Sequence, residues 1–370
     1  MARIAFIAPY ASYYVNFSWD LLKTLVHDGH EVIAIAPDKD NESKFKSIGV
    51  HYRKVPLINT GINPFYDIYS ICILIRLLKK IEPDTVACFS IKPVLYGSIA
   101  ARITKIEDVY LTITGLGYVF IGNTLKQRIL LPLIKALYKV AIKNSKKVFF
   151  QNPDDLLLFE SWKLLTRDNK ALIINGSGVN IDEFSFISSK GEQISFILIA
   201  RLIKDKGIEE FIEASRILKR KYPLLNCKVL GPFDRNPTSI SKEKVKQWVS
   251  EGIIEYLGET SDVRPYLSQS SVFVLPSYRE GTPKSVLEAM SMGLPVITTD
   301  SPGCRETVTH QENGFLVPIK DSKALADAME KFVLNPSLVS IMGYKSREIV
   351  VQKYDVRKVN EFMKDNMGLA

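Results

Sequence analysis

The feature that most constrains the fold is an alternation of short Val- and Ile-rich runs with longer segments of helical periodicity. Seven strands are predicted in the first half of the chain, at residues 3–9, 31–37, 51–56, 85–90, 108–114, 147–151 and 170–175. A second series of six follows at residues 194–201, 226–231, 253–258, 271–276, 295–299 and 314–318. Strands that alternate with helices form parallel sheets covered on both faces, so two series predict an α/β protein with two Rossmann-like domains.

The length of 370 residues fits this division, because chains longer than about 250–300 residues usually form more than one hydrophobic core. We expect an N-terminal Rossmann-like domain over residues 1–178, a polar linker over 179–192 and a C-terminal Rossmann-like domain over 193–350. The last residues, 351–370, are helical in pattern and follow the last predicted strand. We expect this C-terminal helix to pack back on the N-terminal domain.

Composition narrows the classes of protein further. The four cysteines are scattered without a CxxC pair, as in reduced cytosolic proteins, and no Cys/His cluster suggests zinc. No signal peptide is evident, and no apolar run reaches the ~18 residues that a membrane span needs. We therefore expect a cytoplasmic protein that is soluble or peripheral. These cysteines are Cys72, Cys88, Cys227 and Cys304.

Two classes that share a two-domain α/β architecture fit this sequence poorly. A dehydrogenase needs a glycine-rich turn after its first strand, and here that turn, residues 8–14, has no glycine. A periplasmic-type binding protein would need a signal peptide. Transfer of a group from a nucleotide remains the best-fitting activity.

The strongest candidate site is the segment 280–288, which follows a predicted strand. We expect Thr282 to cap a helix whose first residue is Pro283, and the free backbone N–H groups there suit a diphosphate. Glu280 and Glu288 would then accept hydrogen bonds from sugar and ribose hydroxyls. An ordinary strand–helix unit with two solvated glutamates fits the spacing about equally well. The residues predicted to bind the donor are Gly281, Thr282, Pro283, Lys284 and Glu288.

A second candidate is the basic segment 201–207, directly after another buried strand. Arg201 and Lys206 are suited to neutralise a diphosphate leaving group. Taken alone, the segment also fits a plain basic loop before a helix. Both segments follow strands of one predicted sheet and would meet at its carboxyl edge, which favours a shared site.

With these motifs in view, the chain resembles the retaining glycosyltransferases of family GT4. The likeness rests on RLIKDKG at 201–207, the two glutamates of 280–288, NGSGVNIDEF at 175–184 and GFLV at 314–317. It implies the GT-B fold, two Rossmann-like domains whose parallel sheets face a central cleft. It also implies that Arg201 and Lys206 contact the donor diphosphate, that Glu280 lies near the donor sugar as a third catalytic residue, and that Glu288 holds the ribose. The family also implies transfer with retention of the anomeric configuration, without a metal or other cofactor.

A closer likeness is to bacterial HexNAc transferases that act on undecaprenyl-diphosphate-linked sugars, through SIKPVLYGSIAA, TGLGYVFIG and KKVFFQNPDD at 90–101, 114–122 and 146–155. It implies α-linked transfer of GalNAc from UDP-GalNAc to HexNAc-diphospho-undecaprenol in O-antigen or lipopolysaccharide assembly. Transfer of Gal, Glc or GlcNAc in capsule or protein-glycan assembly remains an alternative, as does a UDP-GlcNAc 2-epimerase type of enzyme. Two family features are missing: Thr114 stands where many members have a histidine, and the first loop lacks glycines.

The charge indicates an anionic partner, such as nucleic acid, an anionic lipid surface or a phosphorylated substrate. The formal charge is +9, and residues 1–178 carry 23 Lys and Arg against 15 Asp and Glu. The segment from Leu125 to Lys147 alternates apolar residues with lysines, a pattern suited to an anionic lipid surface at the inner face of the plasma membrane, or to an ordinary packed helix with a basic outer face. Nucleic-acid binding is disfavoured because interleaved aromatics and known motifs are missing.

The triplet Asp38-Lys39-Asp40 is interpreted as a solvated turn rather than a metal site.

Overall fold

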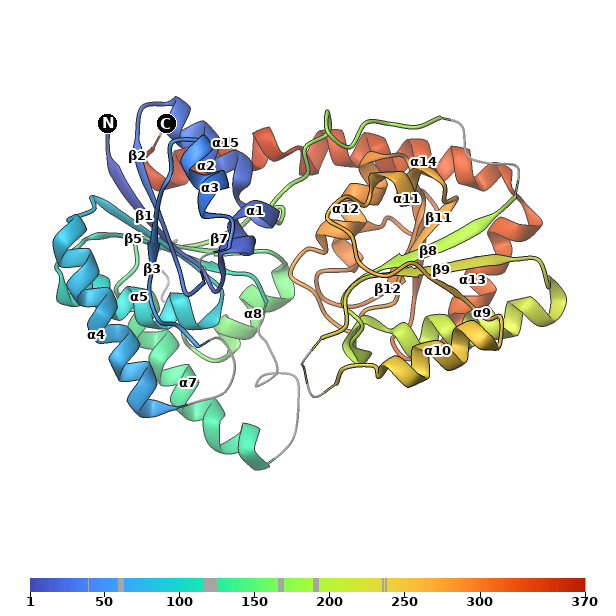
Figure 1. Ribbon diagram of the computed structural model, residues 1–370, viewed down its shortest axis with the longest axis horizontal. Helices are drawn as coiled ribbons and strands as arrows, with labels where there is room; N and C mark the ends of the chain where they lie inside the picture. The colour runs from blue at the N-terminus through green and yellow to red at the C-terminus, as the bar shows by residue number, and fades with distance from the viewer. Residues whose placement is uncertain are drawn as a thin grey trace. The chain divides into compact units, whose positions relative to one another are not determined.

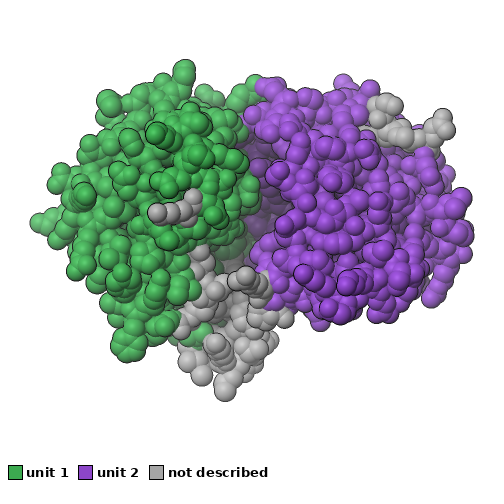
Figure 2. Space-filling model, viewed as in Figure 1, with its two compact units in different colours: residues 1–177, 357–370 green, residues 178–356 purple. Residues whose placement is uncertain are grey.

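The computed structural model describes residues 1–38, 40–58, 63–115, 125–165, 170–188, 193–234, 236 and 238–369. The chain forms two compact units, coloured separately in Figure 2. Unit 1 comprises Met1–Ser177 and Arg357–Ala370, and unit 2 comprises Gly178–Val356. Each unit contains one parallel sheet with helices on both faces, so the predicted α/β architecture with two Rossmann-like domains is confirmed (Figure 1).

The sheet of unit 1 has seven parallel strands in the spatial order β3-β2-β1-β4-β5-β6-β7. Its strands are β1 (Arg3–Ile7), β2 (Glu31–Ala36), β3 (His51–Lys54), β4 (Thr85–Phe89), β5 (Asp108–Ile113), β6 (Lys147–Phe150) and β7 (Ala171–Ile173). The order reverses between β1 and β4, which is where ligands bind in folds of this type. Its helices are α1 (Ala11–Phe17), α2 (Trp19–His27), α3 (Glu42–Ser47), α4 (Pro64–Ile81), α5 (Ile91–Ile103), α7 (Leu125–Lys143), α8 (Pro153–Ser161) and α15 (Val356–Met367).

Side-chain alternation along the strands builds two hydrophobic cores in unit 1. In β1, Ala5 and Ile7 face the core beneath α4, α5 and α7, whereas Ile4 and Phe6 face the core on the opposite side of the sheet. All four are fully buried. Because a strand buried on both faces is apolar at successive positions, the run IAFI that follows Arg3 is the sequence expected of a central parallel strand.

The C-terminal helix α15 contributes to the second of these cores. Met363 and Met367 are buried in it, and the Tyr110 hydroxyl donates to the backbone oxygen of Met367 at 2.8 Å. Lys364 forms an ion pair with Asp28. The last helix of the chain is thus packed into the unit formed by the first 177 residues.

The sheet of unit 2 has six parallel strands in the order β10-β9-β8-β11-β12-β13. They are β8 (Ser195–Ile199), β9 (Asn226–Leu230), β10 (Glu255–Tyr256), β11 (Val272–Leu275), β12 (Val296–Thr299) and β13 (Gly314–Val317). The helices are η1 (Lys204–Lys206), α9 (Ile208–Lys221), α10 (Lys242–Ser250), α11 (Arg264–Ser268), α12 (Lys284–Ser291), η2 (Arg305–Thr307), α13 (Ser322–Leu334), α14 (Ser337–Ile349) and the π-turn η3 (Val350–Tyr354). Each of the thirteen strands predicted from the sequence corresponds to one of these or to one of unit 1.

The described part of the segment 179–192 packs into unit 2. Val179, Ile181 and Phe184 are buried in the core that covers β8, β11 and α12. Polar residues such as Asn180, Asp182 and Glu183 lie between these three. Among the described residues, no helix is both long and apolar enough to span a bilayer.

Candidate active site

The two candidate segments meet at the carboxyl edge of the sheet in unit 2. Strands β8 and β11 are neighbours, so the loops that follow them start side by side. The backbone N–H of Tyr278 donates to the backbone oxygen of Asp205 at 2.9 Å, and the Ser277 hydroxyl donates to the same oxygen at 3.0 Å. The loop carrying Lys206 is therefore bonded directly to the loop carrying Glu280.

Gly207 makes this close approach possible. Its φ is +70°, and a Cβ at this position would lie 2.1 Å from the backbone oxygen of Pro276. Only glycine adopts that backbone conformation without strain and leaves room for the neighbouring loop. The final glycine of RLIKDKG thus has a structural explanation: it allows the turn η1 to lie against the end of β11.

Lys206 and Glu280 form an ion pair within this pair of loops. Their side chains are only 18% and 12% exposed, so the charges are largely removed from bulk water. The backbone of Glu280 is held by a hydrogen bond from its N–H to the oxygen of Pro302 at 2.9 Å. The pair offers a cation and a carboxylate next to each other, the combination needed to bind a phosphate and a sugar hydroxyl at adjacent points.

Arg201 lies at the rim of a cavity of about 230 Å³. Its guanidinium is 2.7 Å from the carboxylate of Asp234, and its side chain is 57% exposed. Gly231 borders the same cavity with φ +148°, where a Cβ would lie 1.9 Å from the backbone oxygen of Ala200. The cavity is formed by the ends of β8 and β9 and the start of α12, and is lined by Ile199, Ala200, Arg201, Leu230, Gly231, Pro232, Thr260, Val263 and Ser285.

Glu288 is a nearly buried carboxyl group on α12. Its side chain is 13% exposed and lies 3.6 Å from the ammonium of Lys284. Burial raises the pKa of Glu288, Lys284 opposes that shift, and the nearby carboxylates of Glu183 and Asp262 add to it. A buried carboxyl with one weak cationic partner can accept hydrogen bonds from ligand hydroxyls at little cost, since burial has already removed most of its water.

This raised pKa predicts a pH-dependent effect of Glu288→Gln on stability. A raised pKa in the folded state means that ionised Glu288 costs stability. This cost in stability is absent below pH 4.5, the ordinary pKa of the carboxyl group. It develops as the pH rises from there through the raised pKa of the folded state. We expect the unliganded variant to match the wild type at pH 4 and to melt ~2–4 °C higher at pH 7.5, which corresponds to about 1 kcal/mol in a domain of this size.

Differential scanning fluorimetry across this pH range checks the expectation, with Glu243→Gln as the control. Hydrogen bonds from its own backbone N–H and from Ser241 lower the pKa of the Glu243 carboxyl, so its replacement should shift the melting temperature in the opposite direction. A melting difference for Glu288→Gln that does not change with pH would contradict this account of the buried carboxyl.

The start of α12 differs from the sequence prediction by one residue. The helix begins at Lys284, and Pro283 occupies the N-cap position without a side-chain capping hydrogen bond. Thr282 is therefore not the N-cap, and Pro283 is not the first helical residue. The ψ of Pro283 is +109°, an extended conformation, which delays the helix by one residue.

Several residues that shape the site were missed from the sequence. Asp234 pairs with Arg201, and Thr260 and Val263 line the cavity. The Tyr278 hydroxyl donates to Glu210 at 2.6 Å and ties the Glu280 loop to α9. For Asp234 the sequence offered one signal: the segment GPFD at 231–234 directly follows β9, which brings its acidic residue to the same sheet edge as Arg201.

The remaining candidate features lie in unit 1. Asp38 accepts from the backbone N–H of Ala11 at 3.1 Å and so caps α1, while Lys39 lies outside the described residues. Thr114 follows β5, and most of the stretch 114–122 that supported the closer likeness also lies outside them. On α7, Lys135 does not belong to the open basic face, because its ammonium lies 4.1 Å from the centre of the Trp162 ring.

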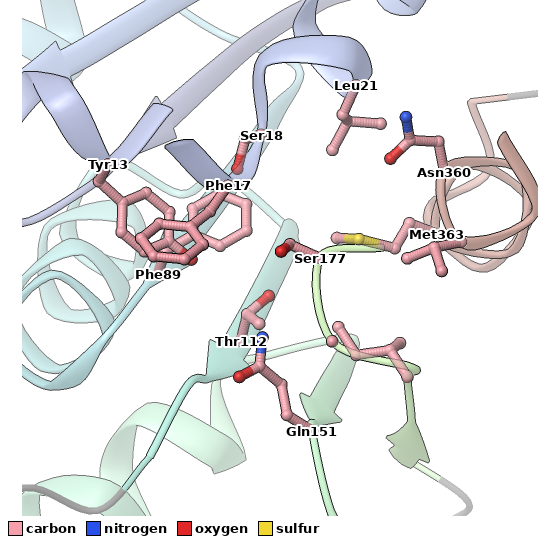
Figure 3. A pocket seen from close by; sticks show the side chains of 13 residues that line it. Tyr13, Phe17, Ser18, Leu21, Phe89, Thr112, Gln151, Ser177, Asn360 and Met363 are labelled. Carbon is pink, nitrogen blue, oxygen red and sulfur yellow. The ribbon is translucent and has the colours of Figure 1, made fainter. Parts of the chain in front are cut away.

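Unit 1 also encloses a small cavity of about 20 Å³, enough for one water molecule. Figure 3 shows Tyr13, Phe17 and Phe89 on one side and Asn360 and Met363 of α15 on the other. Its size makes it a packing feature of the C-terminal helix rather than a substrate site.

Comparison with known proteins agrees with the fold. The sequence model of the family described as "Glycosyl transferases group 1" matches residues 180–349, and that of "Glycosyl transferase 4-like" matches residues 3–152. The sucrose-phosphate synthase structure from Thermosynechococcus elongatus superposes with a TM-score of 0.81 at 20% identity, covering 99% of this chain and 98% of that one. HepE from Anabaena superposes with a TM-score of 0.77 at 15% identity over the full length of both chains.

Fold and family matches together define a glycosyltransferase of the GT-B class. The chain belongs to the glycosyltransferases whose C-terminal domain is of the group 1 type and whose N-terminal domain is of the 4-like type. The family predicted from the sequence is thereby confirmed.

Among curated relatives, the N,N'-diacetylbacillosaminyl-diphospho-undecaprenol alpha-1,3-N-acetylgalactosaminyltransferase of Campylobacter jejuni is 28% identical over 338 residues, 88% of each chain. The UDP-Gal:alpha-D-GlcNAc-diphosphoundecaprenol alpha-1,3-galactosyltransferase of Escherichia coli is 26% identical over 324 residues, covering 84% of this chain and 82% of that one. Both alignments extend over the two units.

Proposed function

We propose that this enzyme transfers N-acetylgalactosamine from UDP-GalNAc, with retention at the anomeric carbon, to a HexNAc-diphospho-undecaprenol in O-antigen or lipopolysaccharide assembly. The observation that carries the proposal is the Lys206–Glu280 pair at the carboxyl edge of the unit 2 sheet, the edge that also carries Arg201 and the cavity beside it. A nucleotide diphosphate needs cations, and the sugars on either side of it need carboxylates. This edge supplies both.

The donor diphosphate is the ligand best suited to the cationic part of the site. Lys206 and Arg201 carry the positive charges, and the backbone N–H groups at the start of α12 add the partial positive charge of a helix N-terminus. When a phosphate oxygen binds, it competes with Glu280 for Lys206 and with Asp234 for Arg201. The released carboxylate of Glu280 can then accept from hydroxyls of the donor sugar.

The cavity beside Arg201 suits the nucleoside. Its volume of about 230 Å³ is somewhat below the ~300–1,000 Å³ of most small-molecule sites, as expected if the diphosphate and sugar lie outside it. Ser285 lines this cavity, and Glu288 follows one turn later on the same helix. We assign Glu288 to the ribose hydroxyls for that reason.

In the proposed reaction, the bond between the anomeric carbon and the diphosphate oxygen breaks, and the acceptor hydroxyl takes its place on the same face of the sugar. Lys206, Arg201 and the α12 N-terminus stabilise the negative charge that grows on UDP as it leaves. The proton of the acceptor hydroxyl passes to a phosphate oxygen of the departing UDP. No cofactor enters this scheme.

The acceptor assignment rests on the relatives. The names of both the Campylobacter and the Escherichia enzymes specify a sugar carried by diphospho-undecaprenol. We assign the same acceptor class to this chain and place the enzyme at the cytoplasmic face of the plasma membrane. The Escherichia relative uses UDP-Gal, so galactose is the second candidate for the transferred sugar.

A donor screen tests the proposal. UDP release is followed with UDP-GalNAc, UDP-GlcNAc, UDP-Gal and UDP-Glc, each with and without a HexNAc-diphospho-undecaprenol acceptor in detergent. We expect the fastest acceptor-dependent release with UDP-GalNAc. Faster release with UDP-Gal would replace the donor assignment, and conversion of UDP-GlcNAc to its 2-epimer without UDP release would overturn glycosyl transfer to the lipid.

We expect turnover to be unaffected by EDTA. Two basic side chains and a helix N-terminus already offset the leaving-group charge, which is the role a divalent ion plays in metal-dependent transferases. Initial rates are measured after dialysis against EDTA, then with Mg²⁺ or Mn²⁺ restored. A more than tenfold loss that either ion reverses would show that the charge is neutralised by metal instead.

A further inference from the structure

The solvent-facing side of α4 carries an unusual run of apolar residues. Phe65, Ile68 and Tyr69 are 88%, 61% and 51% exposed, and Cys72 is also exposed. Their spacing of three and four residues puts them on one face of the helix. An exposed stripe of this kind on a water-facing helix indicates a surface that something apolar covers.

The opposite face of α4 holds the helix firmly on unit 1. Its buried residues are Asp67, Ser70, Leu74 and Leu78. Asp67 forms an ion pair with Lys92 at 2.8 Å, and both side chains are only 12% exposed. The helix is therefore fixed through this inner face, and the apolar stripe points outward without a role in the fold.

The charges beyond the stripe are all basic. Arg76, Lys79 and Lys80 continue the same exposed face toward the carboxyl end of α4. Within residues 63–81, all of which are described, the one acidic residue is the inward-facing Asp67. The exposed face thus passes from apolar to cationic along one helix.

This order of residues selects among possible partners. In a two-fold dimer through this face, the basic residues of both copies would be brought into one interface and repel each other. An anionic lipid surface instead offers acyl chains to the apolar part and phosphates to the basic part. The exposed face of α4 is therefore complementary to an anionic membrane in both charge and hydrophobicity.

We propose that α4 docks on an anionic membrane, with its amino-terminal half inserted among the lipid headgroups and its carboxyl-terminal half held at the phosphates. Phe65 and Arg76 are eleven residues apart, which is about 16 Å along the helix. A modest tilt is enough to lower Phe65 by the ~5–10 Å typical of interfacial helices while Arg76 stays at the phosphates. The inference rests on the proposed function, which puts the acceptor in that membrane.

α4 and α7 lie on either side of α5 over the same face of the sheet (Figure 1). The exposed lysines of α7, Lys139 and Lys143, attract an anionic membrane over a distance, and salt screens that attraction. The apolar stripe of α4 adds a contribution that salt does not screen. Docking through α4 should therefore persist in part at an ionic strength that removes purely electrostatic binding.

Co-sedimentation tests the inference, with vesicles of phosphatidylcholine and phosphatidylglycerol at a ratio of three to one. The full-length variant Phe65→Ser/Ile68→Ser/Tyr69→Ser should bind at least tenfold more weakly than the wild type. The matched control Leu334→Ser/Ile341→Ser/Tyr344→Ser removes three similarly exposed apolar side chains from unit 2 and should bind as the wild type does. Equal binding by both triple variants would overturn the role of α4.

Cys72 provides a second readout in the wild-type protein. It is exposed, whereas Cys88, Cys227 and Cys304 are buried, so an environment-sensitive thiol dye should label it selectively. We expect anionic vesicles to shift the dye emission to the blue and bromine-labelled lipids to quench it. No shift at saturating vesicle concentration would refute insertion, and a blue shift without vesicles that depends on protein concentration would favour a dimer instead.

Failure of this inference can be told apart from failure of the proposed function. A water-soluble HexNAc-diphosphate with a short alkyl chain needs no membrane, so the α4 triple variant should transfer sugar to it at the wild-type rate. If the wild type transfers to neither acceptor, the proposed function is wrong, while the vesicle experiment still decides on α4.

Discussion

Replacing Lys206 by alanine should lower kcat/KM for the sugar donor about ten- to a hundredfold. Loss of a hydrogen bond to a charged group costs ~1.5–3 kcal/mol, and 1.4 kcal/mol corresponds to a factor of ten. Lys206 is expected to show this loss because its ammonium is held at 18% exposure beside Glu280, where a phosphate would find it already desolvated. Steady-state kinetics with varied donor at fixed acceptor measure the effect.

Lys204 supplies the matched control. It lies on the same turn, η1, but is exposed, so Lys204→Ala should retain donor affinity and turnover. Equal kinetics for Lys206→Ala and the wild type would remove Lys206 from the donor site.

A second substitution, at Glu280, separates the effect of Lys206 on folding from its effect on catalysis. Removing the lysine alone takes the Lys206 cation away from the largely buried Glu280 carboxylate, which lowers stability. The double variant Lys206→Ala/Glu280→Gln should recover most of the melting temperature, because the carboxylate charge is removed as well, and its kcat/KM should stay at least as low as that of Lys206→Ala. If the double variant recovered activity together with stability, the pair would be structural and not catalytic.

Reversing the charge of Lys139 and Lys143 on α7 should weaken binding to anionic vesicles about a thousandfold at physiological salt. Each lysine near an anionic surface contributes about 1 kcal/mol. Two reversals lose that attraction and add repulsion of similar size, which amounts to ~4 kcal/mol or about a thousandfold. Both side chains are exposed, whereas Lys135 packs on Trp162, so Lys135 is left unchanged.

Co-sedimentation at increasing salt measures this effect. The control Lys246→Glu/Lys323→Glu makes the same change in net charge on exposed positions of unit 2 and should bind nearly as the wild type does. Wild-type binding should itself weaken with salt, since the Debye length is ~8 Å at 0.15 M. If both double variants lose binding equally, net charge rather than the α7 face governs association.

The strands were predictable because parallel strands buried on both faces leave a plain signature, as in the runs RIAFI and SFILI. The adjacency of the two site loops was also predictable, since both follow strands of one sheet. The sequence did not predict that Lys206 and Glu280, 74 residues apart, pair with each other. Pairing of side chains across loops depends on how those loops turn, here through Gly207 and the extended backbone of Pro283.

The environment of Glu288 is a second feature that could not be predicted from the sequence. Its raised pKa comes from burial and from Glu183 and Asp262, which belong to segments distant in sequence. Nothing in the spacing of 280–288 indicates those neighbours. The segment 179–188 illustrates the same point, because Val179, Ile181 and Phe184 alternate with polar residues and yet are buried in unit 2.

The central claim, transfer of a HexNAc to a lipid-diphosphate sugar, is tested most directly by isolating the lipid product. The enzyme is incubated with UDP-GalNAc and HexNAc-diphospho-undecaprenol in anionic vesicles, and the lipid fraction is analysed by mass spectrometry and NMR. We expect a product larger by one N-acetylhexosamine, with the new linkage in the α configuration, and about ten- to a hundredfold less of it with Lys206→Ala at matched early times. A lipid fraction that gains no sugar while UDP-GalNAc is converted to another nucleotide sugar would contradict the proposed function.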